Sequence, residues 1–142
     1  MICIDKTRCD MAIWQVPITF IPQKSDENSN AVLLNSLNEL STALPEEKSW
    51  CSSIRQYGSI DSTCLEIFFE NGAPEVSLRI DMRSVTEKEL SAIVDFAGEN
   101  GYKAKCADEV FAPTLENLIR IISESDANRF VNDPRGFLGE LS

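Results

Sequence analysis

The sequence predicts an α+β fold in a single domain over residues 1–142, with a mainly antiparallel sheet packed against about three helices and a C-terminal helical tail. Neighbouring segments in the middle of the chain alternate apolar and polar residues, which favours antiparallel strands. Other segments repeat apolar residues at spacings of three and four, as amphipathic helices do. The length of 142 residues, with 43% hydrophobic and 25% charged residues, is typical of one globular domain.

A strand and a helix are predicted in the N-terminal part of the chain. Residues 12–21 carry β-branched and aromatic residues in near alternation, which indicates a strand. Because Pro17 cannot donate to a sheet ladder, it should lie at a sheet edge or mark a break. Residues 30–44 are predicted to form a helix, which Pro45 stops before a loop. The apolar stripe of this helix consists of Leu33, Leu37, Leu40 and Leu44.

The middle of the chain is predicted to be rich in strands. Residues 50–57 form a short strand ended by Gly58, and residues 63–70 form the next one. A turn signal at residues 71–74 leads into a strand over residues 76–82. Around this last strand, Val76, Leu78, Ile80 and Met82 alternate with Ser77, Arg79, Asp81 and Arg83. The alternation predicts that one sheet face packs on helices and the other is polar.

A capped helix and two short strands are predicted after this region. Thr86 and Glu89 form a capping box that opens the helix, and Asn100–Gly101 ends it. The apolar stripe of the helix consists of Leu90, Ile93, Val94 and Ala97. Residues 102–106 and 109–112 are predicted to be strands.

A last helix and a tail complete the predicted fold. The helix starts at Pro113–Thr114, and its apolar stripe consists of Leu115, Leu118, Ile119 and Ile122. Short helical turns follow, in which Phe130 and Phe137 are expected to contact either the core or a partner.

The charge of the chain limits its partners and its chemistry. Lys and Arg number 13 and Asp and Glu number 23, so the formal net charge is −10. A surface this negative repels phosphate groups, so we expect neither nucleic acid nor an anionic membrane as a partner. The sequence has no histidine, the commonest general base and the commonest metal ligand. We therefore predict a binding protein that has no catalytic residues, cofactor or metal.

The cysteines and the N-terminal sequence favour a cytoplasmic protein. Met1–Lys6 shows no secretory signal, and no run of about 18 apolar residues predicts a membrane span. The five cysteines are Cys3, Cys9, Cys51, Cys64 and Cys106. Their odd number and the absence of CxxC pairs favour free thiols in a reducing cytosol.

Three charged residues of one strand face are candidates for a protein contact. Arg79, Asp81 and Arg83 alternate along the strand, and arginine is favoured at the centre of interfaces. The alternative is an intramolecular salt-bridge cluster that orients the strand. A second alternative is acid–base catalysis by Glu66 and Asp81, because paired carboxylates perform such chemistry in glycosidases.

An acidic helix face is the second candidate surface. Glu87, Asp95 and Glu99 lie on the helix after this strand, where they are either solvated or attract a basic partner. The aromatic residues that either anchor such a contact or pack in the core are Trp14, Trp50, Tyr57 and Phe68.

Several segments resemble a known class of small bacterial proteins. They are Trp50, Gly58, Leu65–Ile67, Arg79–Arg83 and Arg129–Leu138. These features are similar to those of immunity proteins of polymorphic or contact-dependent toxin systems. The resemblance implies a cytoplasmic protein that binds one cognate toxin and blocks its active site. It transfers no site residue, because such families have no catalytic motif.

The order of elements over residues 30–125 is also similar to that of class I type III secretion chaperones. This resemblance implies a homodimer that holds a partly unfolded effector. The strand at residues 12–21 and the tail after Ser125 depart from that layout.

The predicted function is that of an immunity protein that neutralises a basic protein toxin by direct binding, as a monomer or homodimer. A dimeric secretion chaperone and a carboxylate-dependent enzyme remain the alternatives. The predicted partner-binding residues are Arg79, Asp81, Arg83, Glu87, Asp95 and Glu99.

Overall fold

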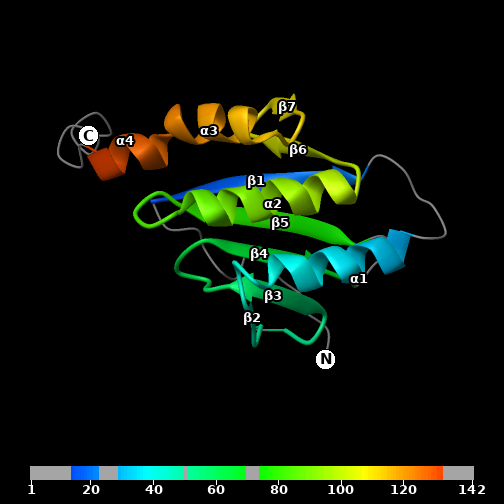
Figure 1. Cartoon of the computed structure of the whole chain (residues 1–142). Coiled ribbons are helices and arrows are strands. Elements are labelled where there is room, and N and C mark those ends of the chain that lie inside the picture. The colour runs from blue at the N-terminus through cyan, green and yellow to red at the C-terminus, as the bar shows by residue number, and fades with distance from the viewer. Residues whose placement is uncertain (1–13, 23–28, 50, 70–73, 133–142) are drawn as a thin grey trace.

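The computed structural model describes residues 14–22, 29–49, 51–69 and 74–132, which form one antiparallel sheet and four helices (Figure 1). The strands are β1 (Gln15–Pro22), β2 (Glu46–Glu47), β3 (Ile54–Gly58), β4 (Cys64–Phe68), β5 (Glu75–Asp81), β6 (Tyr102–Cys106) and β7 (Glu109–Phe111). The helices are α1 (Ser29–Leu40), α2 (Glu87–Glu99), α3 (Leu115–Ser123) and α4 (Asp126–Asn132). The predicted α+β class is confirmed.

The sheet has seven strands in the order β2-β3-β4-β5-β1-β6-β7. The first strand of the chain therefore lies inside the sheet, where it pairs with β5 on one side and with β6 on the other. Figure 1 shows α1 and α2 side by side across one face of this sheet. The central position of β1 joins the β2–β5 meander to the β6–β7 hairpin in one continuous sheet.

Among the described strands, the part of β1 that contains Pro17 has a neighbour on one side only. The β1–β6 register covers Thr19 to Pro22, so β6 ends before it reaches Pro17. The Met82 backbone N–H donates to the Trp14 carbonyl oxygen at 2.9 Å, and by alternation the backbone of Pro17 faces away from β5. The missing N–H of proline therefore costs no ladder hydrogen bond, although β1 is an interior strand and not the edge of the sheet.

The hydrophobic core lies between the helices and one face of the sheet. On the central strands it contains Val16, Ile18, Phe20, Leu65, Ile67, Val76, Leu78 and Ile80. The helices contribute Leu33, Leu37, Leu40, Leu90, Ile93, Phe96, Leu118, Ile121 and Ile122. The period-two pattern of β5 thus places its apolar residues against the helices, as the sequence predicted.

Helix α2 has the ends that the sequence predicted. The Thr86 side chain accepts from the Glu89 backbone N–H at 3.1 Å, and the Glu89 carboxylate accepts from the Thr86 backbone N–H at 2.9 Å. After the last turn, Gly101 has a φ of +66°, which glycine adopts readily. Both ends are set by residues close in sequence.

Gly58 closes β3 in a conformation and a space that suit glycine. Its φ is +87°, and a Cβ atom there would lie 2.2 Å from the Thr63 carbonyl oxygen. The Gly58 backbone N–H donates to the Pro45 carbonyl oxygen at 2.9 Å. The close approach ties the end of β3 to the β3–β4 turn.

The structure corrects several details of the prediction. Glu46 and Glu47 form the edge strand β2 rather than a loop, and the strand predicted from residue 50 begins at Ile54. Ile119 is 46% exposed, and Ile121 is buried in its place. Trp50, the turn residues 71–73 and the tail from residue 133 lie outside the described residues, as does the side chain of Phe130.

The prediction of free thiols is wrong for Cys51, which is disulfide-bonded. Cys64 and Cys106 are free, whereas Cys3 and Cys9 lie outside the described residues. Burial raises the pKa of the Cys106 thiol, and the nearby Glu109 carboxylate adds to this effect, so the thiol is held in its protonated form. Within the described ranges, none of the helices is long and apolar enough to cross a membrane.

Candidate functional site

The six predicted partner-binding residues fall into two groups on different sides of the sheet. Arg79 and Asp81 lie on the face of β5 opposite the core residues Leu78 and Ile80, and Arg83 follows the strand. The second group, Glu87, Asp95 and Glu99, lies on α2, which covers the other face. The sheet therefore separates Arg79 and Asp81 from the acidic helix surface.

Asp81 and Arg83 form a closed ion pair at the end of β5. The Asp81 side chain is 1% exposed, and its Oδ2 atom lies 3.0 Å from Nη2 of Arg83. Its Oδ1 atom accepts from the backbone N–H of Arg83 at 2.8 Å and from Nε at 3.1 Å. Burial of Asp81 opposes its ionisation, but the hydrogen bonds from Arg83 and Ser84 outweigh burial and lower the pKa of Asp81. Asp81 therefore positions Arg83 and is not itself exposed to a partner.

Arg83 connects three segments of the chain. Its guanidinium carbon lies 3.8 Å from the centre of the Trp14 ring, and its Nη2 atom donates to the Asp61 carbonyl oxygen at 3.1 Å. The Trp14 indole N–H donates to the same carbonyl at 3.4 Å. Arg83 is 47% exposed, so it remains accessible to a partner at the edge of this structural cluster.

Arg79 is bound to the other candidate carboxylate. Its Nη2 atom lies 3.0 Å from Oε1 of Glu66, and the side chains are 13% and 9% exposed. The Nη1 atom of Arg79 is buried and has no hydrogen-bond partner among the described residues. Glu66 and Asp81 are thus each paired with an arginine, an arrangement that favours the salt-bridge alternative over a pair of carboxylates sharing a reaction.

The described aromatic candidates are mostly held by the fold. Tyr57 is part of the main core, and Phe68 packs with Cys51 and Ile54 in a smaller cluster. Trp14 is half-buried against Arg83. Among the described aromatic candidates, only Trp14 therefore offers a partly open ring surface.

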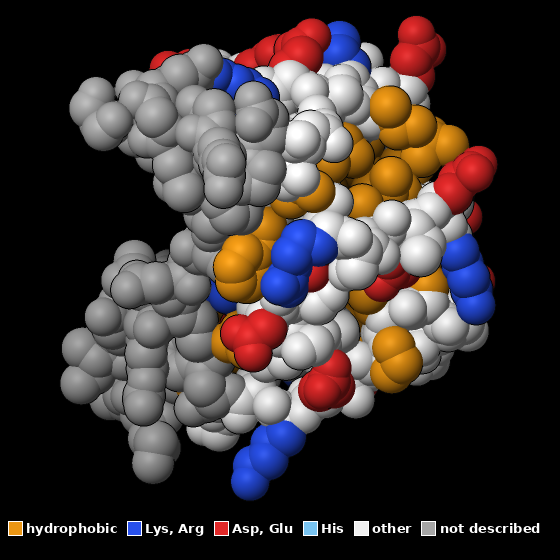
Figure 2. Space-filling view, turned by 90° about the vertical axis from the view of Figure 1, so that its left-hand side faces the viewer, with side chains coloured by type: hydrophobic (Ala, Val, Ile, Leu, Met, Phe, Trp, Pro, Cys, Tyr) orange, Lys and Arg blue, Asp and Glu red, His pale blue; other side chains and the backbone are white. Residues whose placement is uncertain are grey.

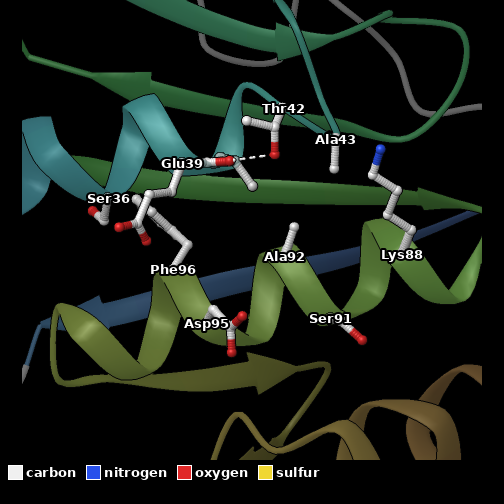
Figure 3. Close-up of a pocket in the computed structure, with 10 residues that line it drawn as sticks. Ser36, Glu39, Thr42, Ala43, Lys88, Ser91, Ala92, Asp95 and Phe96 are labelled. Atoms are coloured by element: carbon white, nitrogen blue, oxygen red, sulfur yellow. Dashed lines mark hydrogen bonds between the residues drawn. The ribbon is translucent and has the colours of Figure 1, made fainter.

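Asp95 of α2 lies beside α1 in a groove that we name the α1–α2 groove. It has a volume of about 300 Å³ and is lined by Ser36, Glu39, Leu40, Thr42, Ala43, Lys88, Ser91, Ala92, Asp95 and Phe96. Figure 3 shows Glu39 reaching from α1 toward α2 near Phe96, with Lys88 at the other end. Glu39 was not among the predicted site residues, because the sequence does not reveal which face of α1 lies against α2.

One hydrogen bond between the two helices, supported by bonds within each of them, holds this groove in place. The Asn100 side-chain nitrogen Nδ2 donates to Ser36 Oγ and to the Phe96 carbonyl oxygen, each at 2.8 Å. Ser36 Oγ in turn donates to the Leu33 carbonyl oxygen at 2.8 Å. These contacts fix the C-terminal end of α2 against the middle of α1.

The electrostatics of the groove are unfavourable for the carboxylates that surround it. A hydrogen bond shared with Glu39 raises the pKa of Glu99, and the nearby negative charges of Glu39 and Asp95 add to this effect. Asp95 and Glu99 are four residues apart on one helix, and the last turn of α2 contains no basic residue. Among the described residues, no salt bridge involves Glu39, Asp95 or Glu99.

Hydrophobic side chains are also exposed elsewhere on the described surface. Figure 2 shows a gathering of them on the upper part of one end, with Asp and Glu side chains around it. Ile119 of α3 is 46% exposed on the helix side of the sheet, whereas Val110 of β7, which is 51% exposed, lies on the sheet face opposite its buried neighbour Phe111. An apolar area with a charged rim is typical of protein-binding surfaces.

Comparison of the chain with protein-family models, with curated proteins and with solved structures gives no match. The candidate site therefore rests on its own geometry. Of the predicted residues, Asp95 and Glu99 are brought together, and the structure adds Glu39 to them.

Proposed function

We propose that this chain is an acidic binding protein that neutralises a cognate bacterial toxin by direct binding and occlusion of its active site. The observation that carries the proposal is the set of three carboxylates at the α1–α2 groove. They belong to Glu39, Asp95 and Glu99, and no described lysine or arginine forms an ion pair with them. A basic partner would supply the missing positive charge.

The positions of these three carboxylates destabilise the folded protein, and this cost supports a role for them in binding. Asp95 and Glu99 lie in the C-terminal half of α2, near the end of the helix that disfavours negative charge. Glu39 brings a third negative charge from α1. Groups that cost stability in the free protein are retained where they act in function. The fold alone gives no reason to gather them.

The charge of the whole molecule supports the same kind of partner. A net charge of −10 raises the rate at which a basic protein arrives at the surface. The hydrophobic side chains that Figure 2 shows among the Asp and Glu side chains would then exclude water from the contact. A toxin with a basic, apolar-lined cleft fits both features.

The place of action that we propose is the bacterial cytosol, where a toxin made by the same cell is first met. The disulfide bond of Cys51 argues in the other direction, since disulfides persist mainly in oxidising compartments. The redox state of Cys51 in protein isolated from cells therefore decides between the cytosol and an oxidising compartment.

The proposal predicts that a gene next to the one for this chain encodes a toxin domain, and co-expression of the chain with that domain tests it. We expect the chain to protect the cells, and a variant with E39Q, D95N and E99Q to lose protection because the groove has lost its charge. The measurement is colony survival after induction of the toxin.

The matched control is a variant with E47Q, D61N and D108N. It removes the same number of charges from exposed residues outside the groove, and we expect it to protect like the wild type. Failure of the wild-type chain to protect, or full protection by the groove variant, would contradict the proposal.

A further inference from the structure

The shape of the α1–α2 groove suits a long, thin side chain. Its volume of about 300 Å³ is at the lower limit of pockets that bind small molecules. Leu40, Ala43, Ala92 and Phe96 provide apolar surface along it. The small side chains of Ala43 and Ala92 leave room on opposite walls (Figure 3). An aliphatic stem can therefore lie along the groove between the two helices.

The charges at the two ends of the groove determine how a cationic side chain would be oriented in it. Glu39 and Asp95 lie toward one end, and Lys88 lies at the other (Figure 3). Glu99 adds its carboxylate at the acidic end, where it shares a hydrogen bond with Glu39. A positive group is attracted to this end and repelled by Lys88.

A metal ion does not fit this arrangement. Within the described residues, no group of three or more carboxylate, thiol or imidazole side chains is placed so that it could hold a metal ion. The groove thus combines carboxylates at one end with apolar side chains along its walls. That combination matches an organic cation on a hydrocarbon stem better than a bare ion.

Building on the proposed function, we propose that the α1–α2 groove receives one lysine or arginine side chain of the toxin. The stem lies against Ala43 and Ala92, and the cationic head lies among Glu39, Asp95 and Glu99. The inserted side chain replaces carboxylate repulsion with charge-assisted hydrogen bonds. It is the contact by which the partner is anchored.

The experiment uses a probe that contains only this side chain. Nα-acetyl-lysine methylamide, with its free ammonium group, is titrated into the full chain labelled with ¹⁵N, at constant ionic strength. We expect saturable shifts of the backbone amide signals of Ala43, Ala92 and Asp95. In a variant with E39Q and E99Q, binding should weaken by about tenfold, as expected for the loss of charged hydrogen bonds.

The matched probe is Nα-acetyl-norleucine methylamide, which has a hydrocarbon stem but no charge. The matched variant has E47Q and D108N, which lie outside the groove. Equal shifts with both probes, or lysine-induced shifts spread evenly over all acidic segments, would overturn the inference. If lysine enters the groove but the chain does not protect cells, the proposed function fails alone. If the chain protects cells and lysine does not enter, the inference fails alone.

Discussion

Asp81 organises the end of β5 through hydrogen bonds in several directions. Its carboxylate accepts from Arg83 and, at 3.2 Å, from the Ser84 hydroxyl, while its backbone N–H donates to Thr63 Oγ1 at 3.0 Å. Its carbonyl oxygen accepts from the Val85 backbone N–H at 2.9 Å. One buried residue thus connects the β3–β4 turn with the chain that enters α2.

We predict that D81N lowers the free energy of unfolding by about 2 kcal/mol, because an amide cannot accept all the donors that face the carboxylate. The measurement is urea unfolding at neutral pH. D61N is the control, since Asp61 contributes its backbone carbonyl and keeps it in the variant. Equal stability of D81N and the wild type would show that the ion pair contributes nothing net.

The alternation of β5 predicted which charged residues share a face but not how they pair. Arg79, Asp81 and Arg83 are two apart, and their common side of the strand follows from that spacing. The Arg79–Glu66 pair depends on the register between β4 and β5, in which Cys64 lies opposite Arg79. That register is set by packing across the sheet, which local sequence does not encode.

Helix α2 shows at the scale of an element which features local sequence determines. Its capping box and its terminal glycine use residues within four positions of each end, and both were predicted. The rotation of α3 was less certain from sequence, because apolar residues occur at positions 118, 119, 121 and 122. Packing against α2 and the sheet selects among them and leaves Ile119 exposed. For the same reason, Glu39 could not be assigned to the groove.

We predict that E99Q raises the midpoint temperature of thermal unfolding at neutral pH. The pKa of Glu99 is raised in the folded protein, so its ionised form disfavours folding. This cost is present above the raised pKa and disappears as the pH falls through it and below 4.5, the ordinary value. The gain from E99Q should therefore shrink in acid.

The measurement is a series of thermal unfolding curves across this pH range, with E47Q as the control. Glu47 is an exposed residue of β2 outside the groove, so E47Q should show no such pH-dependent gain. A lower midpoint temperature for E99Q at neutral pH would contradict the electrostatic description of the groove.

At the scale of the whole molecule, the net charge predicts how fast the partner binds. We expect the association rate with a basic toxin to fall by about tenfold or more between about 50 mM and 500 mM salt, because salt screens attraction over distance. Stopped-flow mixing measures this rate. A rate that does not depend on salt would exclude electrostatic steering while leaving occlusion of the active site intact.

The strand order is the part of the fold that sequence reasoning left open. β1 pairs with β5 and β6, so its partners lie about 60 and 85 residues further along the chain. The hydrophobic pattern predicts that β1 has a buried face, but not which strands lie beside it. The helices and strands could therefore be predicted because they depend on local sequence. The strand order and the groove could not, because they depend on contacts between distant segments.

The open side of β1 at Pro17 has a consequence for solubility. A strand with unpaired N–H and C=O groups is a template on which another chain can add, and such addition leads to fibrils. Proline presents no N–H to an incoming strand and stiffens the backbone where β6 has ended. Among the described strands, Pro17 thereby protects the stretch of β1 beyond the end of β6 from growth into an intermolecular sheet.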